Sequence, residues 1–170
     1  MFDITENAKL VPIQYAIDRT TNAMTTEWIS MKNATKATFI LDQGAISSAS
    51  SIAVTLAVAT DKDGTNAKTI TSASADTTLG LDHYYTNSGD TYTKTSVSSS
   101  TFNLDSHAST LVVIEVLAAE MGTLTSTSVD YDADYVRLSV AASGANAVGG
   151  AMCLLTGLRY QQDTPPSAIT

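Results

Sequence analysis

The chain has 170 residues, the length of one domain with room for an arm or a tail. Apolar residues make up 44% of it, enough for a sizeable core, whereas charged residues make up 15%, below the roughly 25% of an ordinary soluble domain. The net charge is −8 and the few basic residues are scattered, which disfavours nucleic acid and anionic membrane surfaces as partners because both are bound through clustered Lys and Arg.

Ser and Thr together form about a quarter of the chain, a composition that favours β-structure when short Val- and Ile-rich runs lie between them. No apolar run reaches the roughly 18 residues of a membrane-spanning helix, and the amino end lacks the basic and apolar regions of a secretion signal. The single Cys153 excludes an internal disulfide. We therefore expect the chain to fold in a reducing cytoplasm.

Residues 1–27 form a distinct segment, an N-terminal arm or edge strand. Pro12 interrupts the apolar run of residues 10–17, which indicates a sheet edge or an arm lying on a surface. As an arm, this segment would add a strand to the sheet edge of a neighbouring subunit; as an edge strand, it would lie on its own domain. The candidate interface residues are Phe2, Ile4, Leu10, Val11, Ile13, Tyr15 and the nearby Trp28.

Residues 28–160 carry strand signals at the spacing of a β-sandwich, and residues 161–170, with Pro165 and Pro166, read as an extended C-terminal tail. The clearest strands are predicted at 37–42, 52–58, 92–97, 110–116, 135–140 and 151–160, with one helical turn at 118–122. The crossover helices of a parallel α/β fold are absent. The sequence predicts an all-β fold: two antiparallel sheets packed face to face in a jelly-roll-like sandwich.

The sequence offers little for catalysis. His83 and His107 lie in no motif that places them beside a nucleophile or a second ligand, and Cys153 between Met152 and Leu154 is typical of a small buried apolar residue. We expect no catalytic residues, no cofactor and no metal, and therefore not an enzyme.

Two acidic clusters invite comparison with metal sites. The run from Asp61 to Asn66 resembles a calcium loop, but its glycine, Gly64, comes at the fourth place instead of the sixth, so a turn explains it better. The alternating carboxylates of Asp130, Asp132 and Asp134 either share a cation or form a solvated acidic loop, and the loop is the simpler reading.

The tyrosines Tyr84, Tyr85 and Tyr92 flank a predicted hairpin tip at residues 87–90. Together with Trp28 they would suit a carbohydrate-binding face, because aromatic rings combine apolar area with a polar edge. They also suit an ordinary sandwich with half-exposed tyrosines.

The order of the C-terminal strands is familiar. Val113–Val116, Tyr135–Val140 and, after the pair Gly149 and Gly150, Leu154–Tyr160 together resemble the small virion structural proteins of tailed bacteriophages, of the head decoration or cement type. The resemblance covers roughly residues 28–160 and rests on the order of strands rather than on a signature peptide.

This resemblance implies a jelly-roll-like domain, often trimeric, that binds the outer surface of the assembled major capsid protein and stabilises the shell. It implies no catalytic residues, and it implies a location on the virion after synthesis in the host cytoplasm. A tail, neck or fibre component and a carbohydrate-binding β-sandwich are the alternatives.

Overall fold

The computed structural model describes residues 8–44, 52–69, 83–97, 101–104, 110–126, 129–142, 148–159 and 169. In this part of the chain the regular structure is β-strand, apart from one short 3-10 helix, η1 (Ala118–Glu120). No helix among the described residues has the length and apolarity needed to cross a membrane.

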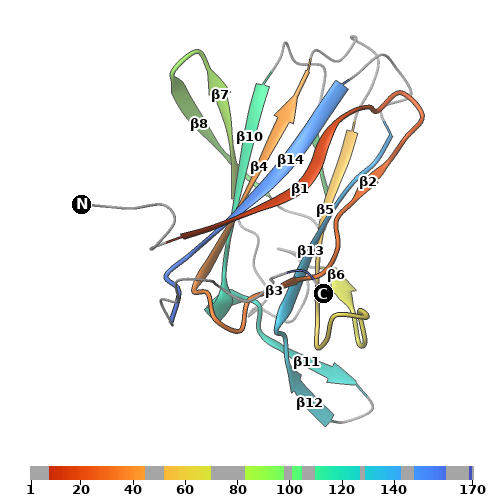
Figure 1. Cartoon of the computed structure of the whole chain (residues 1–170), viewed down its shortest axis with the longest axis vertical. Helices are drawn as coiled ribbons and strands as arrows, with labels where there is room; N and C mark the ends of the chain where they lie inside the picture. The colour runs from red at the N-terminus through yellow and green to blue at the C-terminus, as the bar shows by residue number, and fades with distance from the viewer. Residues whose placement is uncertain are drawn as a thin grey trace.

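The larger sheet has six strands, all paired antiparallel (Figure 1). In spatial order they are β1 (Ala8–Asp18), β14 (Val148–Thr156), β4 (Lys36–Gln43), β10 (Thr110–Leu117), β7 (His83–Ser88) and β8 (Thr91–Ser96).

The second sheet is built on two central strands, β13 (Tyr135–Val140) and β5 (Ile52–Ala59). The short strands β2 (Met24–Thr25) and β3 (Ile29–Ser30) pair with β13. On the far side of β5 lie β9 (Thr101–Leu104) and β6 (Lys68–Thr69). A separate hairpin of β11 (Thr123–Ser126) and β12 (Val129–Asp132) projects below both sheets in Figure 1.

The chain changes sheet at each main connection. It runs from β1 to β2 and β3, then to β4, β5, β9, β10, β13 and β14, with the β7–β8 and β11–β12 hairpins inserted. The four strands β1–β14–β4–β10 thus face the strands β2/β3–β13–β5–β9. This alternation is a jelly roll, and it confirms the predicted all-β sandwich.

The core lies between the two sheets. From the larger sheet, Val11, Cys153, Phe39 and Ile114 occupy neighbouring register positions and are all buried. The second sheet contributes alternate residues of its two central strands: Val54, Leu56, Val58, Val136, Leu138 and Val140. The period-two pattern that predicted these strands is therefore the pattern of inward-facing side chains.

Several local expectations need correction. The acidic stretch before β13 is not a loop throughout, because residues 129–132 form strand β12. The predicted last strand begins earlier and ends earlier, at Val148 and Thr156. The predicted helical turn is the 3-10 helix η1, followed by Gly122 with a φ of +69°.

Arg19 joins three parts of one end of the sandwich although it is fully buried. Its guanidinium donates one hydrogen bond to Gln43 Oε1 at 2.9 Å and another to the carbonyl oxygen of Ala141. Burial lowers the pKa of Arg19, but a guanidinium keeps its proton at neutral pH. Arg19 thereby ties the segment after β1 to the ends of β4 and β13.

Two glycines with left-handed backbones give a matched stability test. Gly157 and Gly89 have φ values of +63° and +65°. A Cβ on Gly157 would overlap Thr35 Oγ1, whereas a Cβ on Gly89 would meet nothing within 4 Å. We expect Gly157→Ala to lower the free energy of unfolding by about 1 to 3 kcal/mol more than Gly89→Ala, the usual cost of overpacking.

The measurement is urea denaturation of each variant. Backbone strain, about 1 to 2 kcal/mol for a non-glycine residue at positive φ, is shared by the two variants and cancels in their difference. Equal losses of stability would show that the close approach of Gly157 to Thr35 carries no energetic weight.

Candidate interaction surface

Exposed large apolar side chains gather on one sheet. In the described part of the chain there are six, and every one belongs to a strand of the larger sheet: Leu10, Tyr15, Tyr92, Leu117, Val148 and Met152. The second sheet exposes no large apolar side chain among its described residues. The two outer faces of the sandwich therefore differ in chemistry.

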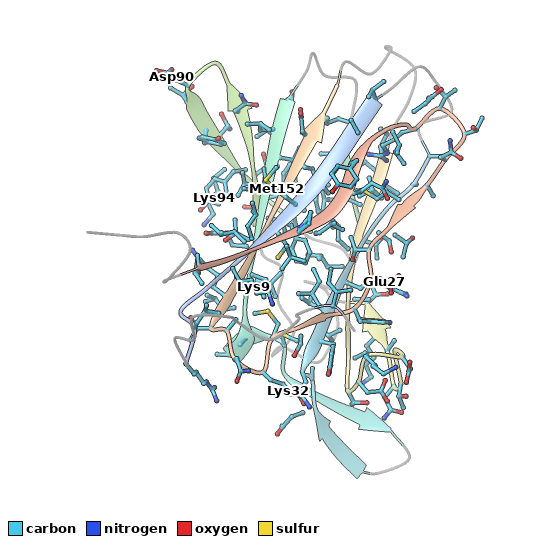
Figure 2. All side chains as sticks on the ribbon, viewed as in Figure 1. Lys9, Glu27, Lys32, Asp90, Lys94 and Met152 are labelled. Carbon is cyan, nitrogen blue, oxygen red and sulfur yellow. The ribbon has the colours of Figure 1, made fainter. Side chains whose placement is uncertain are left out.

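The strand register shows how these side chains combine into a surface. Pro12, Met152, Ile40, Val113 and Tyr85 occupy neighbouring positions on β1, β14, β4, β10 and β7. Because each alternates with a core-facing residue, these positions face outward. We call the outward-facing residues of this sheet the outer face; it also includes Leu10, Leu111, Leu154 and Tyr92. Figure 2 labels Met152, which belongs to strand β14.

Three strands of this sheet are apolar on both sides. Strand β10 runs Leu111-Val112-Val113-Ile114, and the middles of β4 and β14 are similar. Strands with continuous apolar runs are normally covered on both faces. Here the core covers one face, and in the described part of the chain no element is packed on the other.

The outer face carries little net charge. Lys36 and Glu115 form an ion pair with 2.6 Å between Nζ and Oε1, and each is about one-third exposed. Asp42, Lys94 and, at the exposed end of β1, Asp18 are the other charged residues that face outward on this sheet. Two positive and three negative groups leave this surface with one net negative charge, on a chain whose net charge is −8.

A hollow of about 310 Å³ lies at the β8 end of the outer face. Tyr85, Tyr92, Val113 and Glu115 line it. It combines two aromatic rings with a carboxylate, but that carboxylate is already paired with Lys36.

The predicted interface residues do not form one surface. Leu10 and Tyr15 on β1 are 54% and 84% exposed, and Ile13 is half-buried against the core. Val11 is buried inside the sandwich, so its side chain is not available to a partner. Phe2 and Ile4 lie outside the described residues. The segment that was predicted as an arm or edge strand contains β1, which pairs with β14 of its own domain.

Trp28 is buried as well, with 6% of its surface exposed. Its ring lies between the guanidinium of Arg137, 4.3 Å from the ring centroid, and Gly64 in the turn after β5. Arg137 alternates with buried Val136 and Leu138, so Trp28 covers the outer side of the second sheet. It cannot contact a partner or a sugar without displacing that turn.

The three tyrosines face two different sides of the sheet. Tyr84 packs against the core and stacks on Phe102, with 4.3 Å between ring centroids and 14° between ring planes. Tyr85 and Tyr92 belong to the outer face. The predicted carbohydrate platform of Tyr84, Tyr85, Tyr92 and Trp28 is therefore wrong as a set, because two of its four members are turned inward or covered.

The run from Asp61 to Asn66 is a turn, as expected. Asp61 Oδ1 accepts hydrogen bonds from the backbone N–H groups of Asp63 and Thr65, and Gly64 has a φ of +81°. Hydrogen bonds from Thr65 lower the pKa of Asp61. Its carboxylate is thus occupied in closing the turn.

The other acidic cluster is divided between a strand and a loop. Asp130 and Asp132 belong to β12, and Asp134 follows it. The Asp134 carboxylate lies 3.3 Å from the ammonium of Lys32. Among the described residues, no three potential metal ligands come together.

A second hollow, of about 430 Å³, lies where η1 meets the base of the β11–β12 hairpin. Lys32, Asp132, Asp134 and Arg159 contribute its charged groups. Because both signs are present and Lys32 pairs with Asp134, the hollow has no single charge that would select a ligand.

Of the side chains of Cys153, His83 and His107, the structure describes only that of Cys153. Cys153 is buried in the core, and burial raises the pKa of its thiol to about 12, so the thiolate that nucleophilic chemistry needs is not formed at neutral pH. The side chain of His83 and the whole of His107 lie outside the described residues.

The residues that the sequence prediction missed are Ile40, Val113, Met152 and Leu154. Val113 was predicted to lie in a buried strand, and the other three were assigned to strands without an interface role. The signal that marks them is the presence of apolar residues at both odd and even positions of those strands. A run that is apolar at odd and even positions needs cover on both sides. Among the described residues, the core covers one side and no element covers the other.

Comparisons with known proteins add little. No protein family and no curated protein matches the chain. A solved structure of infectious bursal disease virus, Gt strain, aligns with 89% of this chain and 36% of the viral chain, at 9% sequence identity and a TM-score of 0.23. The chain thus spans about a third of that protein, and a TM-score of this size supports no functional assignment.

Metal removal tests the acidic cluster. Because Asp134 is paired with Lys32, we expect EDTA to leave the melting temperature unchanged. The measurement is a thermal melt with EDTA and again with added Ca²⁺. A melting temperature that falls by several degrees in EDTA and recovers with Ca²⁺ would show that Asp130, Asp132 and Asp134 bind a cation.

The Cys153 thiol gives a second test. We expect a thiol reagent such as Ellman's reagent to react slowly with the native protein at mildly alkaline pH, and to react fully once urea unfolds it. The raised pKa also predicts that stability falls as pH rises from about 8.5, the ordinary thiol value, toward 12, because the unfolded thiol ionises first. Rapid stoichiometric labelling of the folded protein would contradict the burial of Cys153.

Proposed function

We propose that this chain is a structural component of a tailed-phage virion that binds the outer surface of the assembled capsid and stabilises it. The observation that carries the proposal is the outer face of the larger sheet, which is apolar, low in net charge and uncovered in the described part of the chain. The strand order resembles that of head decoration proteins, and this resemblance implies that the partner is the major capsid protein.

The outer face has the composition of a protein-binding surface. The buried centres of protein interfaces are poor in charge and rich in aromatic residues and Met, and the row from Met152 to Tyr85 fits that description. A large exposed apolar patch on a folded domain usually marks such a contact. A face with little net charge also allows an acidic protein to approach an acidic partner.

The proposed role needs neither catalysis nor a cofactor. A shell protein needs a rigid sandwich and a surface that contacts a repeated lattice. Because many copies bind one particle, and because the resemblance implies an oligomer, commonly a trimer, weak contacts at single sites are multiplied by avidity. The protein would be made in the host cytoplasm and would remain on the capsid exterior, away from nucleic acid and membrane.

One observation favours a second candidate, a carbohydrate-binding module. The hollow lined by Tyr85, Tyr92 and Glu115 presents two aromatic rings beside a carboxylate. A tail, neck or fibre component would use the same outer face against a different virion protein.

The test is cosedimentation with capsids that were assembled without this protein, at low and high salt. We expect salt-resistant binding of the wild type, because the contact is apolar. Met152→Asp should weaken binding about tenfold or more while the melting temperature changes little, since Met152 is 41% exposed. Asn103→Asp, on the exposed surface of the second sheet, adds the same charge and should bind as the wild type does.

Three outcomes would overturn the proposal. Wild type that remains in the supernatant excludes capsid binding, and sedimentation with purified tails instead would assign it to the tail. Equal binding of Met152→Asp would exclude the outer face as the contact. Retention on a polysaccharide column that is lost with Tyr85→Ala, without capsid binding, would favour the carbohydrate module.

A further inference from the structure

The strand β8 is a sheet edge with an open side. It pairs with β7 through six consecutive residues, from Thr91 opposite Ser88 to Ser96 opposite His83, without a register shift. In the described part of the chain no strand lies on its other side (Figure 1). Five of its six side chains are exposed.

The two edges of the larger sheet differ. At the other edge, β1 contains Pro12 and two register shifts, between Pro12 and Gln14 and between Gln14 and Ile17. Besides a lysine on the edge, proline and bulges are devices by which proteins prevent edge-to-edge pairing. Strand β8 has neither, and its sequence Thr-Tyr-Thr-Lys-Thr-Ser is rich in residues that favour strands.

The hairpin turn determines which backbone groups face the open side. The turn has two residues, Gly89 and Asp90, and Gly89 has a φ of +65°, as a type II′ turn requires. In such a hairpin, Ser88 and Thr91 close the turn, and their backbone N–H and C=O groups point toward each other. Along β8, residues whose backbone groups point toward β7 then alternate with residues whose backbone groups point away from it. The N–H and C=O groups of Tyr92 and Lys94 therefore face away from β7.

We propose that β8 pairs antiparallel with β8 of a second copy of this chain, about a two-fold axis at Tyr92. In this register Tyr92 lies opposite the partner subunit's Tyr92, and Lys94 lies opposite the partner subunit's Asp90. Figure 2 shows Asp90 at the hairpin tip and Lys94 further along the same strand. The four-residue spacing of these opposite charges makes the edge complementary to itself.

Neighbouring registers of the two β8 strands are energetically less favourable. Pairing about Lys94 places two ammonium groups directly opposite each other, which is destabilising. Pairing about Thr93 places Asp90 opposite Ser96 and forms no ion pair. The Tyr92 register has two ion pairs and one aromatic pair.

The result is a closed dimer in which the two larger sheets become one continuous sheet. A two-fold contact uses the same surface on both subunits and is complete with two copies, so this geometry predicts a dimer and not the trimer that the resemblance implies. It uses the edge of the sheet and leaves the outer face uncovered, so it does not depend on capsid binding.

The experiment is light scattering coupled to size exclusion, at protein concentrations of about 10 to 300 µM, a range suited to a weak strand contact. We expect the wild type to approach twice 17.8 kDa. Lys94→Asp and Asp90→Lys should each elute near 17.8 kDa, because each places like charges opposite each other. An equimolar mixture of the two variants should recover the dimer, since both cross-pairs then become attractive.

The control is Lys62→Asp, which makes the same change in net charge in an exposed turn far from β8. It should dimerise as the wild type does, and circular dichroism should show all variants folded. A wild type that is monomeric over the whole range, a trimer, or charge variants that still dimerise would each overturn the proposal. Failure of the mixed variants to recover the dimer would exclude the Tyr92 register.

Discussion

The sharing of one core by two sheets is the constraint on which the rest of this structure depends. Every strand has two faces, and the sandwich covers one of them. On the second sheet the uncovered side carries small and polar residues such as Ala57 and Ser139, together with Trp28 beneath its turn. On the larger sheet the uncovered side is apolar. This asymmetry distinguishes one face of an otherwise ordinary jelly roll, and the proposed partner contact is based on it.

The sequence predicted the main strands because each of them must bury alternate side chains. The boundaries of β13 match the prediction from residue 135 to residue 140, and β5 and β10 differ by about one residue. The short strand β2 and the hairpin of β11 and β12 were not predicted, whereas β3 lies within a short strand predicted at residues 28–32. Their pairing is determined by the register of distant strands, and two to four residues carry too little pattern to show it.

The candidate surface was harder to predict, for a related reason. Apolar residue types in the N-terminal segment suggested an interface, yet Val11 lies in the core while Leu10, next to it, is exposed. Which side of β1 faces inward depends on its pairing with β14, more than 130 residues away, and local sequence does not contain that information. The stronger signal was the lack of alternation in β10 and β14. A strand that is apolar on both sides needs cover on both faces, and the core of a sandwich covers only one of them.

The position of Trp28 has a spectroscopic consequence. It is the sole tryptophan of the chain, and its indole is enclosed by Arg137 and the turn that contains Gly64. Intrinsic fluorescence therefore reports the closure of that turn over the second sheet. The outer face of the larger sheet lies on the opposite side of the core, so a ligand could cover it completely and leave the emission spectrum as it was.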